Sequence, residues 1–306
     1  MNFFCCVPNL FTGAGSLGLL TSLVLLAGLA PEAQAAVSCT VNAGVGITRA
    51  HNAGGTLVAN GSSSFTVTCT RLTGDTTLGS LQIRNDRGQN RSADQQRAVL
   101  TGLGNCNPAT DCLLYNLTRP IAVSLWSNNV PSQSIDLAFD FLSTAALSRT
   151  ISITYDWNIP APQIVKAGTF IDTVEIRAAY DFGAGVNTAV ASFPVTIVAP
   201  ASCSFATAPG PVAFGNYNAF TTTAGAATTT FAANCTNNLQ YTMALNATSG
   251  VAAGLRYTLA LSATTAMGTG VAQTHTITGS IPAGQAGTCA AAACSQSVPH
   301  SVTITY

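Results

Sequence analysis

Side chains that could carry catalysis are few and scattered in this sequence. The nearest approach to a carboxylate pair is Asp136 and Asp140, which are four residues apart in an alternating, strand-like stretch and therefore share a face. Two facing carboxylates are what glycoside hydrolysis requires. No glycine-rich phosphate loop and no nucleophile elbow accompany them. We interpret the pair as solvated surface and predict that the protein is not an enzyme; a secreted hydrolase ranks far below the other hypotheses.

A second charged group mixes both signs within one short segment. Its members are Arg84, Asp86, Arg87, Arg91, Asp94 and Arg97. Mixed charges favour a salt-bridged loop over an anion site. The whole chain balances 11 Lys and Arg against 11 Asp and Glu, and only 7% of its residues are charged. Because no basic patch exists to neutralise phosphates, we expect no nucleic-acid partner.

Cysteine spacing favours disulfides over a metal site. Ten cysteines are present, and eight remain once Cys5 and Cys6 leave with an export signal: Cys39, Cys69, Cys106, Cys112, Cys203, Cys235, Cys289 and Cys294. None forms a C-x-x-C motif, and none of the three histidines, His51, His275 and His300, adjoins a close cysteine pair. We therefore predict no metal and no cofactor. Four cysteines in a domain allow three pairings, of which we favour the sequential one in an oxidising compartment.

The cysteine plan occurs twice, which indicates two related domains. A wide pair followed by a narrow one is found in each half of the chain. The segment Ile159–Gln163, of sequence IPAPQ, also returns as Ile281–Gln285, of sequence IPAGQ. We predict domain one at residues 36–200 and domain two at 201–306. Domain one is longer between its equivalent landmarks, and long insertions in compact sandwiches commonly form functional loops.

The first 35 residues are predicted to be a signal peptide. Leu17–Ala30 is an apolar run too short for a comfortable membrane span, and Ala33–Ala35 is a small-x-small cleavage site. Passage through the periplasm and an extracellular location follow. A lipoprotein acylated at Cys39 is an alternative, but it would leave Cys69 without its partner.

Alternation of apolar and polar residues predicts an all-β protein. Period-two segments lie at 64–70, 121–126, 151–157, 228–232, 241–245 and 257–261, and Gly, Asn, Asp and Pro separate them. This texture is typical of immunoglobulin-like β-sandwiches, here two in tandem. Trp126 and Trp157 lie on such strands and are expected in the core. A single helical turn within 91–100 is the one exception we allow.

The two domains are predicted to end differently. Domain one continues beyond its tyrosine-ended strand into a further apolar strand, Ala191–Val198, whereas domain two stops at Tyr306. We therefore expect the second sandwich to lack its final strand and to accept one from another chain along Val302, Ile304 and Tyr306. Only three residues, 36–38, precede Cys39, so this chain is expected to accept a strand without donating one.

Binding is expected on apolar loops of domain one. The candidate adhesive residues border or lie within its extra length: Leu100, Leu103, Leu113, Leu114, Tyr115, Val130 and Pro131. Exposed apolar loop tips can attach to hydrophobic surfaces without chemical specificity. In domain two Arg256 is the only charged side chain, which favours coverage by partner subunits.

Three segments together resemble the spore coat protein U domain family, which includes the subunits of archaic (Csu-type) chaperone-usher pili. They are Gly168–Val174, similar to the closing G-x-Y-x-D-T-V strand, Phe214–Tyr217, similar to the F-G-x-Y element, and Val302–Tyr306, similar to the terminal strand. Domain one lacks an F-G-x-Y element after Cys39, and Val298–His300 replaces D-T-V in domain two.

The resemblance implies a pilus-tip adhesin that attaches cells to abiotic or host surfaces and promotes biofilm. Its implied partners are a periplasmic chaperone, an outer-membrane usher and an adjacent pilin subunit that donates a strand. The alternative is a structural coat or stalk protein without an adhesive site.

Overall fold

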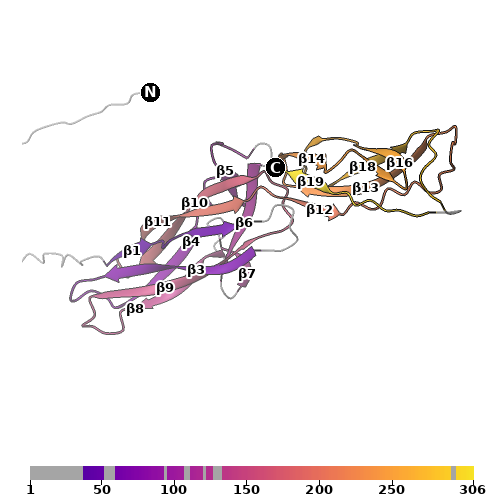
Figure 1. The fold of residues 1–306 in the computed structure, drawn as a ribbon. Coiled ribbons are helices and arrows are strands. Elements are labelled where there is room, and N and C mark those ends of the chain that lie inside the picture. The colour runs from indigo at the N-terminus through magenta and orange to yellow at the C-terminus, as the bar shows by residue number, and fades with distance from the viewer. Residues whose placement is uncertain are drawn as a thin grey trace, which may run out of the picture. The chain divides into compact units, whose positions relative to one another are not determined.

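The protein folds into strands throughout the part of the chain that its structure describes. The computed structural model describes residues 37–51, 59–92, 95–106, 111–119, 122–126, 133–290 and 294–306. These residues form strands β1 to β19 and contain no α-helix (Figure 1). The predicted all-β architecture of two tandem domains is confirmed. The segments expected to form the signal peptide lie outside the described residues, and within the described ones no helix is long and apolar enough to cross a membrane.

Domain one comprises eleven strands. They are β1 Ser38–Asn42, β2 Ile47–Ala50, β3 Ala59–Thr70, β4 Leu78–Asn85, β5 Gln96–Leu100, β6 Cys112–Arg119, β7 Ala122–Leu125, β8 Ile135–Asp140, β9 Ser148–Ile159, β10 Gly168–Asp181 and β11 Asn187–Ala199. Their order is β1-β3-β9-β6-β5-β10-β11-β2, with β4 beside β10, β8 beside β4, and β7 beside β6. Among the described strands, β2 and β11 are the one pair that runs parallel.

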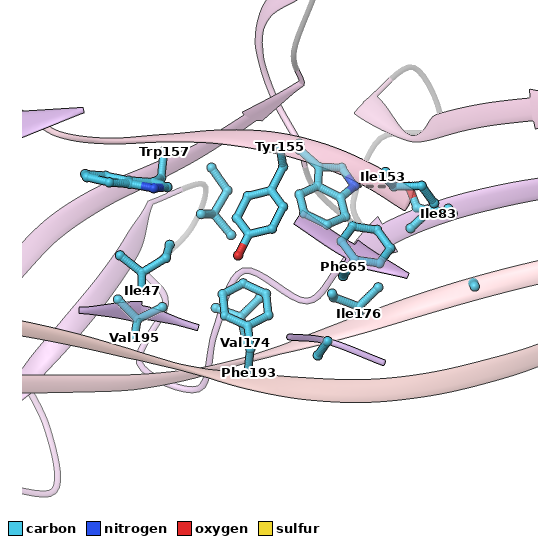
Figure 2. Close-up of a cluster of buried hydrophobic side chains, with 14 of the residues drawn as sticks. Ile47, Phe65, Ile83, Ile153, Tyr155, Trp157, Val174, Ile176, Phe193 and Val195 are labelled. Atoms are coloured by element: carbon cyan, nitrogen blue, oxygen red, sulfur yellow. Dashed lines mark hydrogen bonds between the residues drawn. The ribbon is translucent and has the colours of Figure 1, made fainter. Parts of the chain in front are cut away.

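The core of domain one lies between the layer of β3 and β9 and the layer of β10 and β11. Phe65 and Tyr155 come from the first layer, and Val174 and Phe193 come from the second (Figure 2). Tyr155 packs on Phe193 with ring centroids 5.5 Å apart. Burial raises the pKa of Tyr155 to about 12. Trp126 and Trp157 are buried, as predicted.

Domain two comprises eight strands in two sheets. They are β12 Cys203–Thr207, β13 Gly225–Cys235, β14 Gln240–Leu245, β15 Ser249–Ala252, β16 Leu255–Leu261, β17 Thr265–Met267, β18 Ala272–Ile281 and β19 Val302–Thr305. A five-stranded sheet has the order β12-β13-β18-β16-β15, and a three-stranded sheet has the order β17-β14-β19.

The disulfides occupy equivalent positions in the two domains. Cys39 pairs with Cys69 across β1 and β3, and Cys203 pairs with Cys235 across β12 and β13. The narrow pairs, Cys106–Cys112 and Cys289–Cys294, are also bonded. The described residues therefore contain four disulfides in sequential order, with separations of 30, 6, 32 and 5 residues, and each restricts the unfolded chain.

The repeated IPAPQ and IPAGQ segments share a side-chain role. The Gln163 amide accepts from the Leu114 backbone N–H at 2.6 Å and donates to the Leu114 carbonyl at 2.9 Å. Gln285 forms the same two bonds with the backbone of Arg256, at 2.7 and 3.0 Å. Each glutamine thus imitates a neighbouring strand, which explains why this residue returns in both copies.

One local expectation is wrong. Residues 96–100 form β5 rather than a helical turn, because β5 pairs with β6 on one side and with β10 on the other. Its Ala98 is fully buried in the core. The conformation of residues 96–100 is therefore set by pairing with neighbouring strands and not by local helix preference.

Candidate functional site

The edge of β10 in domain one is covered along its whole length. β10 pairs with β11 continuously from Gly168 opposite Ala199 to Tyr180 opposite Asn187. Its other side pairs with β4 and β5. Val174 and Ile176 are consequently fully buried. Domain one thus satisfies both edges of this strand from its own sequence.

The corresponding strand of domain two has a neighbour on one side only. β19 pairs with β14, from Thr305 opposite Thr242 to Val302 opposite Leu245, and no other described strand pairs with it. Val302 and Ile304 pack half-buried against the domain-two core, whereas Tyr306 is 57% exposed. Unpaired N–H and C=O groups therefore line one side of β19, beside an apolar row.

The core of domain two is correspondingly open. In domain one, 31 described core residues are buried and nine more are half-buried. In domain two only nine are buried, and thirteen are half-buried, including Val212, Phe214, Val298, Val302 and Ile304. More than half of the second core thus keeps part of its apolar surface in water, where it contributes less to stability.

A hydrogen-bonded cluster fixes β19 in register at its start. Asn246, which follows β14, accepts a bond from the Ser301 backbone N–H at 3.0 Å, and its own N–H donates to the Ser301 carbonyl at 3.1 Å. His300 lies 3.2 Å from the Asn246 side-chain oxygen and 2.7 Å from the Tyr257 hydroxyl. We call Asn246, Tyr257 and His300 the strand latch.

The predicted adhesive residues do not form one exposed surface. Leu113 and Tyr115 are 0% and 2% exposed and belong to the core, so the prediction is wrong for both. They alternate along β6 with outward residues, and period-two burial places them inside. Leu100 and Leu114 are half-buried, Leu103 is 42% exposed, and Val130 and Pro131 lie outside the described residues.

Exposed apolar side chains gather instead at the opposite end of domain one. Leu100 pairs with Phe170, close to Ala199, where the chain leaves the domain. At the other end the β3–β4, β8–β9 and β10–β11 connections carry Leu72, Leu142, Leu147 and Val186, which are 62%, 72%, 45% and 73% exposed, and Leu78, the first residue of β4, is 64% exposed. We call these five residues the apolar cap.

Pairing of the surrounding strands brings the three connections together. Leu78 lies opposite Asp140, and Ser80 lies opposite Asp181. Beneath them Phe139, Phe141 and Phe182 pack with ring centroids 5.2 to 5.8 Å apart. Figure 1 shows β8 and β9 leading into this end of domain one. The sequence signal for the cap is a lone apolar residue beside turn-forming residues, such as Leu72 before Thr73-Gly74 and Val186 after Gly185.

The buried carboxylate of Asp172 holds a loop of domain one. It accepts bonds from the Tyr115 hydroxyl at 2.6 Å and from the backbone N–H groups of Gln89 and Thr173 at 2.9 Å each. Burial raises the pKa of this carboxyl, while those bonds favour its ionised form. The glycine at position 88 is required, because a Cβ there would collide with the carboxylate. Asp172 is structural, since every partner is part of the surrounding fold.

The charged residues considered for catalysis have separate local roles. Asp136 accepts from the Ser134 hydroxyl at 2.9 Å, and Asp140 accepts from the Leu142 backbone N–H at 2.8 Å. In the 84–97 segment, Asp86 accepts from the Gly88 backbone N–H at 2.9 Å. Among the described residues no group of three or more His, Cys, Asp or Glu side chains could hold a metal ion.

The described residues thus form two β-sandwiches in tandem, and the second has an uncovered strand edge at β19. The Spore Coat Protein U domain matches residues 23–177 and 189–300, so the chain belongs to that family, whose members are structural and non-enzymatic. No curated protein sequence matches the chain.

Several solved structures have similar folds at low sequence identity. One is the chaperone–tip adhesion subunit pre-assembly complex of CsuC and CsuE from Csu pili of Acinetobacter baumannii; at 15% identity the match covers 88% of this chain and all of that chain, with a TM-score of 0.45. Another is the CupB6 tip adhesin of Pseudomonas aeruginosa, at 12% identity, with 89% and 94% coverage and a TM-score of 0.38.

Proposed function

We propose that this protein is the tip adhesin of a bacterial chaperone-usher pilus, assembled by strand donation to domain two. The observation that carries the proposal is the difference between β10, covered by β11, and β19, which no described strand covers on its second side. An incoming extended segment would satisfy the free backbone groups of β19 and bury Val302 and Ile304.

The partners follow from this edge. An uncovered apolar edge is prone to aggregation, so a periplasmic chaperone occupies it first, and an adjacent pilin subunit replaces the chaperone at an outer-membrane usher. Domain one needs no such partner. It is therefore available for attachment to abiotic or host surfaces, which would promote biofilm.

The apolar cap is the adhesive part of this proposal. Four exposed apolar side chains on three neighbouring connections, together with Leu78 at the start of β4, are unusual for such a surface, which is normally polar. They stand at the end of domain one opposite Ala199, where the chain leaves the domain. We therefore replace the adhesive loops expected from sequence with this cap.

Strand acceptance is tested on the full mature chain with a synthetic peptide of the β11 sequence, Asn187–Ala199. Both tryptophans lie in domain one, so tryptophan fluorescence reports domain one alone, while far-UV circular dichroism reports both. We expect the transition seen only by circular dichroism to rise by about 5 °C or more with excess peptide. A peptide with serine at Phe193, Val195 and Ile197 is the control. Equal transitions with both peptides would contradict strand acceptance.

Adhesion is tested in cells that display the pilus. Leu72→Ser with Leu142→Ser should strongly reduce attachment to a hydrophobic surface while fibre number stays unchanged. Val190→Ser, at a 56% exposed position within β11, is the matched control. Unchanged attachment by the double variant would favour a structural coat or stalk role.

A further inference from the structure

Arg71 is a buried cation at the base of the apolar cap. It directly follows β3, and only 5% of the residue is exposed. Its guanidinium donates to four backbone carbonyls, those of Asp75 at 2.8 Å, Ser143 at 3.1 Å, Thr144 at 2.6 Å and Ala146 at 2.9 Å. It also lies over the Phe141 ring, 5.2 Å from the centroid.

These four acceptors belong to two different connections. Asp75 lies in the β3–β4 connection, while Ser143, Thr144 and Ala146 lie in the β8–β9 connection. The Arg71 backbone N–H adds a bond to the Leu147 carbonyl at 2.9 Å. One side chain thus joins the two segments that carry Leu72, Leu142 and Leu147. A planar guanidinium with five N–H groups can reach four separated carbonyls, which an ammonium cannot.

The surrounding strands also have contacts of their own. Phe139, Phe141 and Phe182 pack on one another directly, and β3, β4, β8 and β9 keep their own backbone ladders. The bonds of Arg71 add to the local turns of the two connections, such as the bond from the Asp75 N–H to the Leu72 carbonyl, and hold one connection against the other. Ordering before contact lowers the entropic cost of binding.

We infer that Arg71 is the positioning residue of the adhesive surface, which it preorganises by clamping two of the three cap-bearing connections. This inference rests on the proposed adhesive function of domain one. The clamped loops present Leu72, Leu142 and Leu147 as one rigid apolar surface suited to another apolar surface.

The test uses Arg71→Met in the displayed pilus and in the purified full chain. We expect attachment to a hydrophobic surface to fall roughly tenfold, since three side chains lose their fixed positions. Hydrogen exchange of residues 72–77 and 142–147 should rise at least about tenfold, because the bonds that restrain these loops are gone. Fibre number and the fluorescence melting transition should stay near those of the parent protein.

Two further variants complete the design. Arg149→Met is the matched control, because Arg149 also stacks on a phenylalanine of this end, Phe139, but bonds to a single carbonyl, that of Asp140. Arg71→Lys keeps the charge without the fork of donors and should behave like Arg71→Met. Attachment restored by Arg71→Lys would show that charge alone matters and would overturn the inference.

The outcomes separate this inference from the proposed function. Loss of attachment in Leu72→Ser with Leu142→Ser, together with normal attachment in Arg71→Met, refutes the positioning role alone. Normal attachment in both refutes the adhesive cap. A fall in fibre number or in the fluorescence transition with Arg71→Met would assign Arg71 to folding instead.

Discussion

The strands β10 and β19 occupy equivalent places in the two domains but differ in their surroundings. β10 has β11 on one side and β4 and β5 on the other, whereas β19 has only β14 among the described strands. The cores differ in parallel, since most core residues of domain one are buried and most of those in domain two are half-buried. A single strand thus separates a self-sufficient sandwich from one with an open edge.

The comparison also shows what the open domain retains. Its β12–β13 disulfide and the Gln285 bonds to Arg256 repeat the Cys39–Cys69 and Gln163 contacts of domain one. The five-stranded sheet thus keeps these contacts of domain one, and the uncovered β19 edge lies in the sheet of β14, β17 and β19. Under the proposed function, an assembly partner would supply one strand and not a whole layer.

The sharpest test of this comparison is a matched pair of isoleucines. Ile176→Ala in β10 removes a fully buried side chain and should cost about 2–5 kcal/mol of unfolding free energy. Ile304→Ala in β19 removes a half-buried one and should cost about 1 kcal/mol. Urea unfolding followed by fluorescence and circular dichroism separates the domains.

Addition of the β11 peptide should then enlarge the cost of Ile304→Ala and leave that of Ile176→Ala unchanged. Equal costs at the two positions without peptide would mean that domain two is already closed.

A smaller effect is expected at the strand latch. Asn246→Ala removes the acceptor of the Ser301 N–H and should destabilise the start of β19 by about 1 kcal/mol. Hydrogen exchange at residues 301–305 should accelerate. Asn116→Ala, which removes an amide bond to Asn158 in domain one, is the control and should leave β19 unchanged. Unaltered hydrogen exchange in Asn246→Ala would contradict the claim that the strand latch fixes the start of β19.

The smallest effect concerns pH. Burial lowers the pKa of His275, which lies 2.9 Å from the Tyr241 hydroxyl in domain two. The stability contributed by its neutral form is complete above the ordinary pKa of about 6.5 and is lost as pH falls toward the lowered value. His275→Gln should flatten this dependence in the circular dichroism transition. His51 is also buried and has a lowered pKa, so its replacement should flatten the pH dependence of the fluorescence transition of domain one. An effect of His275→Gln on the fluorescence transition would contradict the assignment of His275 to domain two.

Much of the fold follows from short-range patterns. Alternation over Ile151–Trp157 and Tyr257–Leu261 identifies β9 and β16, because period-two burial is a local property. The apolar alternation after Tyr180 likewise identifies β11. The cysteine spacing indicates the duplication, because the same pattern of intervals returns in each half of the chain.

The candidate adhesive surface could not be obtained in this way. Leu113 and Tyr115 were expected in loops because they border or lie within the extra length of domain one, but pairing of β6 with β5 and β9 makes them core. The bonds of Arg71 and the position of the apolar cap depend on contacts between connections that are far apart in sequence, such as those that contain Asp75 and Ala146. Residue spacing does not reveal this long-range packing, so neither feature could be predicted from the sequence.

The order already present in the five-stranded sheet bears on the strand acceptance that we propose. Since the disulfide and the Gln285 bonds already order that layer, a donated segment would lose only its own freedom and would not have to fold the domain around itself. Under this proposal, one occupant of the β19 edge would replace another stepwise along the strand, without unfolding of the acceptor domain.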